Sequence, residues 1–108
     1  MPYTVGAELI EAPLFSRLIY EYLGEEEYAA LQWALVLRPE AGTVIPGSGG
    51  VRKLRWSGSG RGKRGGLRVI YYWRSRTGQI WLLTVYAKNE AATIPAAVLR
   101  ELRREIEG

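Results

Sequence analysis

The sequence has neither cysteine nor histidine. Without cysteine the chain forms no disulfide and has no thiolate nucleophile. Without histidine it lacks the commonest metal ligand and the usual base at neutral pH. Any catalysis must therefore come from Lys, Arg, Tyr, Glu or Ser side chains.

Long hydrophobic runs are also missing. No apolar stretch approaches the roughly 20 residues that cross a bilayer, and the N-terminus has no basic segment followed by an apolar block. We therefore expect a cytoplasmic location and no membrane partner. The hydrophobic content of 47% indicates a globular fold, and we expect one domain spanning residues 1–108.

Positive charge is concentrated in one part of the chain. Residues 47–90 contain ten Lys or Arg and one Glu, whereas residues 1–46 contain seven Glu and two Arg. Residues 91–108 contain three of each sign, so the formal net charge of +4 hides a strongly basic middle segment. A concentrated positive field on a small domain favours a polyanionic partner such as nucleic acid.

The N-terminal part is predicted to form a short strand over residues 4–10 and then two helices. Apolar residues recur every three or four positions over residues 14–23, after Pro13, which suits a first helical turn. Gly24 ends that helix, and three glutamates begin the next, since carboxylates interact well with the N-terminal end of a helix dipole. The second helix ends before Pro39, and the two helices form an antiparallel hairpin.

Three runs rich in β-branched and aromatic residues follow a glycine cluster at residues 47–50. A final helix is predicted after Thr93 as its N-cap, with Pro95 in its first turn. The order β-α-α-β-β-β-α predicts an α+β fold in which an antiparallel sheet packs on the N-terminal helical hairpin. The three strands are expected at residues 51–56, 66–73 and 79–88, with a hairpin turn at Thr77-Gly78.

The glycine-rich segment at residues 60–65, GRGKRG, matches the pattern G-x-G-x-x-G. A dinucleotide site needs a helix directly after this pattern, whereas a strand follows here, and Lys63 is not followed by the Ser or Thr of a P-loop. A disordered basic arm is a second interpretation. The third, which we prefer, is a hairpin connection from which Arg61, Lys63 and Arg64 reach a phosphate backbone.

Alternation along each strand sorts the side chains onto two faces of the sheet. One face is expected to be apolar or aromatic and to pack on the helical hairpin; it comprises Leu54, Trp56, Leu67, Val69, Tyr71, Trp73, Trp81, Leu83 and Val85. The other face is mixed and comprises Lys53, Arg55, Arg68, Ile70, Tyr72, Leu82, Thr84, Tyr86 and Lys88.

The mixed face is the candidate site. Cations on an open sheet face are often simply solvated, and Lys commonly protects sheet edges. Here, however, cations from all three strands share one face with no Asp or Glu among them, and such an accumulation favours an anionic partner. Tyr72 is interpreted as a packing residue, and Tyr86 as one that can stack on a base.

Three segments and the order of elements resemble the RelE/ParE superfamily of type II toxin-antitoxin toxins, and within it the HigB-type branch. The segments are IPGSGGVRKLRW at residues 45–56, GRGKRGGLRVIYYW at residues 60–73 and LLTVYAKNE at residues 82–90. Together with the predicted helices they cover essentially the whole chain.

The resemblance implies a small toxin that enters the ribosomal A site and cuts mRNA there without a metal or other cofactor. It also implies a cognate antitoxin with a helix-turn-helix domain, similar to HigA. In such toxins, cations on the concave face of the sheet bind the RNA backbone and stabilise the transition state, and Lys53, Arg55 and Arg68 match these positions. Lys88 matches a basic residue after the last strand. Several relatives use a Tyr near the C-terminus, which the last predicted helix lacks, so Tyr86 is expected to stand in.

Cleavage of RNA requires the 2′-hydroxyl to be deprotonated, the phosphorane charge to be stabilised and the 5′-oxygen to be protonated. Arg68 is suited to hold the scissile phosphate, because a guanidinium matches phosphate with two donors. Lys53 or Lys88 is the candidate acid or base. The full set of expected roles is: Arg68, Lys53 and Arg55 on the phosphate, Tyr86 and Lys88 on the base and leaving group, and Arg52, Arg61, Lys63 and Arg64 as further RNA-binding residues.

Two other functions fit the same features. ParE-type members of the superfamily poison DNA gyrase and do not cut RNA, and the fold alone does not distinguish the two outcomes. A noncatalytic RNA-binding or protein-binding module would use the same cations only to grip phosphates.

Overall fold

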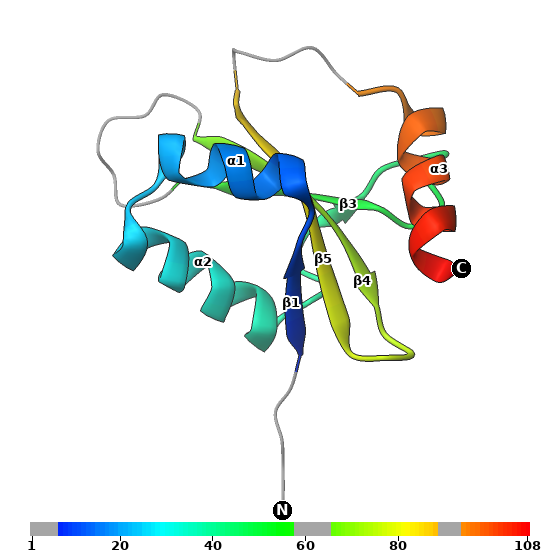
Figure 1. Cartoon of the computed structure of the whole chain (residues 1–108), viewed down its shortest axis with the longest axis horizontal. Coiled ribbons are helices and arrows are strands. Elements are labelled where there is room, and N and C mark those ends of the chain that lie inside the picture. Colours follow the sequence, from blue (N-terminus) through cyan, green and yellow to red (C-terminus); the bar gives the residue numbers. More distant parts are fainter. Residues whose placement is uncertain (1–6, 58–65, 89–93) are drawn as a thin grey trace, which may run out of the picture.

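The computed structural model describes residues 7–57, 66–88 and 94–108 (Figure 1). Both predicted N-terminal helices and the C-terminal helix are present, as are the three main strands. Thr93, the expected cap of the last helix, lies outside the described residues, and Pro95 is at the cap position. The elements are β1 (Glu8–Glu11), α1 (Pro13–Tyr22), α2 (Glu25–Leu37), β2 (Thr43–Val44), β3 (Arg52–Trp56), β4 (Leu67–Arg74), β5 (Gln79–Ala87) and α3 (Ala96–Glu107).

The strands form one sheet in the order β1-β5-β4-β3-β2. The strands β3, β4 and β5 are an antiparallel meander, which confirms the α+β prediction. The sheet is nevertheless mixed, because β1 pairs in parallel with β5. The two-residue strand β2, which was not predicted, pairs with β3 at its other edge. The first difference concerns a pairing between segments far apart in the sequence, and the second concerns a strand of two residues, which is too short to show a pattern.

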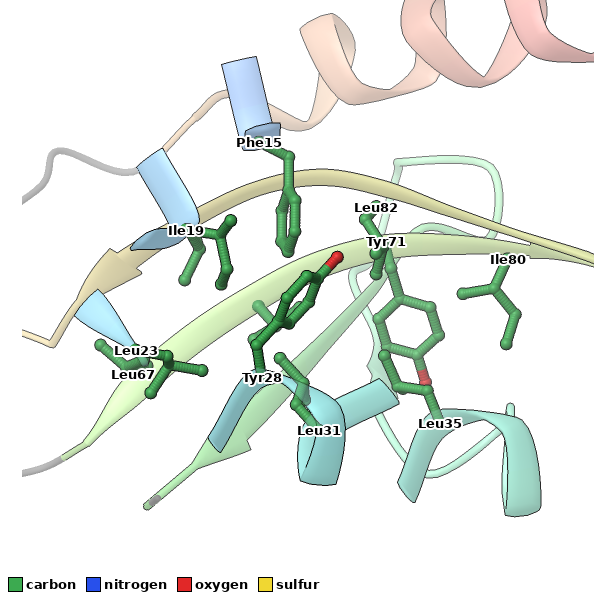
Figure 2. Packing of buried hydrophobic residues seen from close by; sticks show 12 residues of the cluster. Phe15, Ile19, Leu23, Tyr28, Leu31, Leu35, Leu67, Tyr71, Ile80 and Leu82 are labelled. Atoms are coloured by element: carbon green, nitrogen blue, oxygen red, sulfur yellow. The ribbon is translucent and has the colours of Figure 1, made fainter. Parts of the chain in front are cut away.

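The helical hairpin covers one face of the sheet, as predicted. Helix α1 places Phe15 and Ile19 against the strands, and α2 contributes Tyr28, Leu31 and Leu35 (Figure 2). All five are at most 3% exposed. The sheet side of this first core consists of Leu67, Val69, Tyr71, Ile80, Leu82 and Val85.

Helix α3 covers part of the opposite face and lies on the other side of the sheet from α1 and α2 (Figure 1). Its buried Leu99 packs with four residues from the sheet and the segment before β3, which are Val51, Ile70, Tyr72 and Leu83. Strand β4 therefore lies between two cores, and six of its eight residues are buried. The packing role predicted for Tyr72 is confirmed.

A β-bulge in the β4–β5 ladder changes which side chains face each core. Ile70 pairs with Thr84 and Tyr71 with Leu82, so Leu83 is the extra residue. The predicted placement of Trp81 and Leu83 on the hairpin side is therefore wrong: both lie on the α3 side, and Leu82 lies in the first core. Strict alternation fails because one inserted residue reverses the parity of a strand.

The buried Tyr71 connects the sheet to the segment after α2. Its hydroxyl donates a hydrogen bond to the Pro39 carbonyl at 2.7 Å and accepts one from the Gly42 amide at 2.9 Å. Burial raises the pKa of Tyr71, so the phenol stays neutral and keeps its proton for Pro39. A Cβ at Gly42 would lie 2.9 Å from the Tyr71 ring, so a glycine is needed at this close approach.

The glycine cluster before β3 forms a turn around the buried Ser48. The Ser48 hydroxyl donates to the Ile45 carbonyl at 2.6 Å and accepts from the Val51 amide at 3.0 Å. Gly47 and Gly49 have φ values of +79° and +82°, a region that favours glycine. Arg100 of α3 donates to the Gly47 carbonyl at 2.8 Å, so the turn and the helix are directly linked.

The end of α3 is held by Glu107. Its carboxylate accepts hydrogen bonds from the Tyr72 hydroxyl at 2.5 Å, Arg76 at 2.9 Å and Arg74 at 3.1 Å. The hydrogen bond from Tyr72, followed by those from Arg76 and Arg74, lowers the pKa of Glu107 to about 2. Burial, followed by the hydrogen bond to Glu107, raises the pKa of Tyr72.

Replacing Tyr71 with Phe should destabilise the protein. The substitution keeps the ring but removes the partner of the Gly42 amide and the Pro39 carbonyl, and leaving such buried groups unpaired costs about 1–3 kcal/mol. Urea unfolding measures the change. The matched control is Tyr20→Phe at a residue that is 60% exposed, where we expect a change within about 0.5 kcal/mol. Equal effects of the two substitutions would contradict the role assigned to Tyr71.

The stability of the protein should fall in acid partly through Glu107. Its pKa is lowered to about 2 in the folded state, so the stability it provides is complete above the ordinary carboxyl range and is lost as the pH falls through about 2. We expect Glu107→Gln to flatten the fall in unfolding free energy between about pH 4.5 and pH 2. Glu105→Gln, on an exposed residue of the same helix, should leave that slope intact; equal slopes for all three proteins would exclude this contribution.

Candidate nucleic-acid interface

Three adjacent strands place Arg55, Arg68 and Tyr86 in one row across the sheet. Arg55 of β3 pairs directly with Arg68 of β4, and Arg68 pairs directly with Tyr86 of β5. Directly opposed residues on an antiparallel pair share a face, with Cβ atoms about 4.5–5.5 Å apart. The row therefore joins two guanidinium groups and a phenol as immediate neighbours.

Two lysines flank this row on the same face. Lys53 is two residues before Arg55 on β3 and pairs with Ile70, which is in the α3-side core. Lys88 follows β5, where its amide donates to the Gly66 carbonyl at 3.2 Å and continues the ladder by one step. We call Lys53, Arg55, Arg68, Tyr86 and Lys88 the basic row. The structure thus places all five predicted residues together on the side of the sheet that faces away from the helical hairpin.

The side chains of the basic row differ in solvent exposure. Lys53, Arg55 and Lys88 are exposed, Tyr86 is half-buried and Arg68 is 8% exposed. The guanidinium of Arg68 lies against its own strand, with NH1 3.5 Å from the Leu67 carbonyl. The arrangement is a buried central guanidinium surrounded by cations that solvent can reach.

Three arginines form ion pairs with glutamates of α3. Arg74 and Arg76 pair with Glu107, and Arg104 pairs with Glu101. Within residues 7–57, 66–88 and 94–108, none of Lys53, Arg55 and Lys88 forms an ion pair. Lys53, Arg55 and Lys88 are exposed like charges on one face of the sheet, so an anion bound beside them would reduce their mutual repulsion.

Tyr86 lies at the edge of a small cavity of about 50 Å³. Lys53 also lines this cavity, and the remaining walls are aliphatic: Ile45, Ile70, Ile94 and Leu99. Ile94 and Leu99 come from the segment that begins α3, so the packing of α3 supports the side chain of Tyr86. Ile45 and Ile94 were not predicted to lie at the site. The only sequence signal is that each precedes a proline outside the regular strands.

Arg52 is separated from the basic row. It lies on β3 directly before Lys53, so alternation directs it to the other face. Its guanidinium donates to the carbonyls of Gly42 at 2.8 Å and Glu40 at 3.1 Å. These bonds hold the segment between α2 and β2, and its position gives no support to the predicted RNA-binding role. The other predicted RNA-binding residues, Arg61, Lys63 and Arg64, lie outside the described residues.

Over the described ranges, no cluster of three or more His, Cys, Asp or Glu residues is placed to hold a metal ion. None of the helices in those ranges combines the length and the apolar character needed to cross a membrane. The basic row is accordingly built from Lys, Arg and Tyr side chains alone.

Solved structures show what this fold is similar to. No family model matches the chain. A solved structure of the E. coli toxin RelE in the free state, in a variant with two arginines replaced by alanine, is similar to it with a TM-score of 0.55. The sequences are 19% identical, and the match covers 92% of this chain and 98% of that one. At this identity the likeness concerns the fold, and the chain therefore has a RelE-like fold.

Proposed function

We propose that the protein is the toxin of a type II toxin-antitoxin system and that it cleaves mRNA on the ribosome. The observation that supports this most directly is the in-register row of Arg55, Arg68 and Tyr86 flanked by Lys53 and Lys88. The RelE-like fold adds support, because the similar structure is that of a toxin. The HigB-type branch, a cytoplasmic location and a helix-turn-helix antitoxin similar to HigA are parts of the same proposal.

The proposed reaction is the attack of an RNA 2′-hydroxyl on the adjacent phosphate. The hydroxyl loses its proton, the new P–O bond forms as the bond to the 5′-oxygen breaks, and that oxygen takes up a proton. Negative charge grows on the nonbridging oxygens, and preorganised donors at that position lower the barrier most. Arg55 and Arg68 provide such donors side by side, in a setting where charge-assisted hydrogen bonds are strong.

The remaining members of the basic row have positioning and proton-transfer roles. Lys53 and Lys88 flank the two arginines, so one, as the neutral amine, can accept the proton of the 2′-hydroxyl, and the other, as the ammonium, can supply one to the leaving oxygen. Tyr86 offers an aromatic face beside the cations, where a base next to the scissile phosphate can stack. Cations that surround the phosphate neutralise its developing charge, and the mechanism we propose therefore uses no metal ion.

Removing the central guanidinium groups should abolish cleavage. We expect Arg55→Ala and Arg68→Ala each to lower the rate by about 100-fold to 1,000-fold, since a donor aimed at developing charge contributes that much. Mapping of mRNA 5′ ends in a ribosome-containing translation reaction measures the cuts. Because Arg55 is exposed, its variant should remain folded even where the buried Arg68 variant does not. Arg17→Ala, on an exposed residue of α1, is the matched control.

Other results would indicate one of the competing functions. Uncut transcripts together with DNA breaks in cells would identify a gyrase poison. RNA binding that weakens steeply with salt, without cleaved products even on ribosomes, would identify a noncatalytic module. Either result, or full cleavage by a folded Arg55→Ala variant, would overturn the proposed function.

Tyr86 should act through its ring. We expect Tyr86→Phe to keep cleavage within a few-fold of wild type and Tyr86→Ala to lower it by roughly 10-fold to 100-fold, because stacking on one base is worth about 1–3 kcal/mol. Single-turnover cleavage on programmed ribosomes gives the rates. A loss as large in Tyr86→Phe as in Tyr86→Ala would instead indicate that the hydroxyl takes part in proton transfer.

A further inference from the structure

Helix α2 is apolar on the side that faces away from the sheet. Its inner side packs Tyr28, Leu31 and Leu35 into the first core. On the outer side, Trp33 is 65% exposed and Leu37 is 72% exposed, the two highest values among the large exposed hydrophobic residues described. A helix at a protein surface normally has a polar outer side, and one that is apolar all round is normally buried. The outer side of α2 therefore has the character of a contact surface.

The exposed outer residues follow helical spacing. Ala30, Trp33 and Leu37 are three and four positions apart, so they align in one stripe, which Ala29 widens. We call these four residues the α2 stripe. Charges occur only at its two ends: Glu25 and Glu26 are exposed in the first turn, and Arg38 is exposed directly after the last. The stripe is acidic at one end, basic at the other and uncharged between.

The α2 stripe is complementary to the stripe of a second copy that runs in the opposite direction. In an antiparallel pair of α2 helices, with the twofold axis level with the midpoint between residues 31 and 32, Trp33 of each copy lies level with Ala30 of the other. The large indole then packs over a small residue, and Leu37 lies level with Glu26. Each Arg38 approaches the acidic first turn of the second copy, and the antiparallel helix dipoles add to this attraction. A parallel pair would instead place like charges together.

We propose that the protein forms a twofold-symmetric homodimer through antiparallel contact of the α2 stripes. Alanines in the stripe allow helix axes to approach within about 8–10 Å, and a twofold interface uses the same patch on both copies. Helix α2 has 13 residues, a length of about 20 Å, so the interface is small and the dimer is weak, with a dissociation constant on the order of 10–100 µM. Because α2 packs on the sheet face opposite the basic row, both copies of that row stay uncovered.

Sedimentation velocity over about 1–200 µM protein tests the dimer. We expect the sedimentation coefficient of the wild type to rise with concentration towards that of a dimer, and Trp33→Glu to stay monomeric throughout. Val98→Glu introduces the same charge at a residue that is 48% exposed on α3, and this control should dimerise like the wild type. Circular dichroism establishes that each variant is folded, and Leu37→Glu is a second variant of the stripe.

Charge reversal tests the antiparallel arrangement. We expect Arg38→Glu and Glu26→Arg each to weaken dimerisation about 10-fold or less, and the double variant to restore it, since the two charges exchange ends. In a parallel dimer the double variant would keep like charges opposed and would show no rescue. Lack of rescue would therefore overturn the antiparallel geometry.

Three outcomes would overturn the homodimer itself. They are a wild-type protein that stays monomeric at about 200 µM, a Trp33→Glu variant that dimerises like the wild type, and a monomeric wild type that instead binds the product of a neighbouring reading frame in a Trp33-dependent way. The last result would assign the stripe to a different protein. Cleavage assays are independent of all three, because Trp33 lies outside the basic row.

Discussion

The register of the β3–β4–β5 meander is the constraint on which the rest of the structure depends. Strand β4 is buried between two cores, so a shift by one residue would exchange every side chain between the hairpin side and the α3 side. The same register sets Arg68 opposite Arg55 and Tyr86. Stability and the candidate chemistry therefore depend on one set of strand pairings, and Arg68 lies on the strand that packs against both cores.

The two faces of the sheet are covered differently. The hairpin face is largely apolar and is covered by α1 and α2, and Tyr71 connects it to the loop after α2. The opposite face is shared, because α3 covers its apolar part and the basic row occupies the remainder. Glu107 holds the C-terminal end of α3 to β4, and Arg100, in the second turn of α3, bonds to the glycine turn. Through Leu99, this anchoring also fixes one wall beside Tyr86.

Most elements could be predicted from local pattern, and the errors have identifiable causes. Helical spacing located α1 and α2, and runs rich in β-branched and aromatic residues located β3, β4 and β5, because both signals come from side chains that the fold must bury. The bulge at Leu83 has no such signal, and it reversed the faces expected for Trp81, Leu82 and Leu83. The parallel pairing of β1 with β5 depends on packing between segments about seventy residues apart.

For the candidate site, the sequence by itself determined which residue types were available and that Lys53 and Arg55 would share one face, because alternation within a strand is local. Only the tertiary structure decided that Arg55, Arg68 and Tyr86 are direct neighbours, since register between strands depends on both cores at once. It also decided that Arg52 holds a loop and that Arg68 is buried while Lys53 is exposed. The exposure of a side chain and its hydrogen-bond partners depend on how the chain packs, and the alternation of residues along a strand does not determine them.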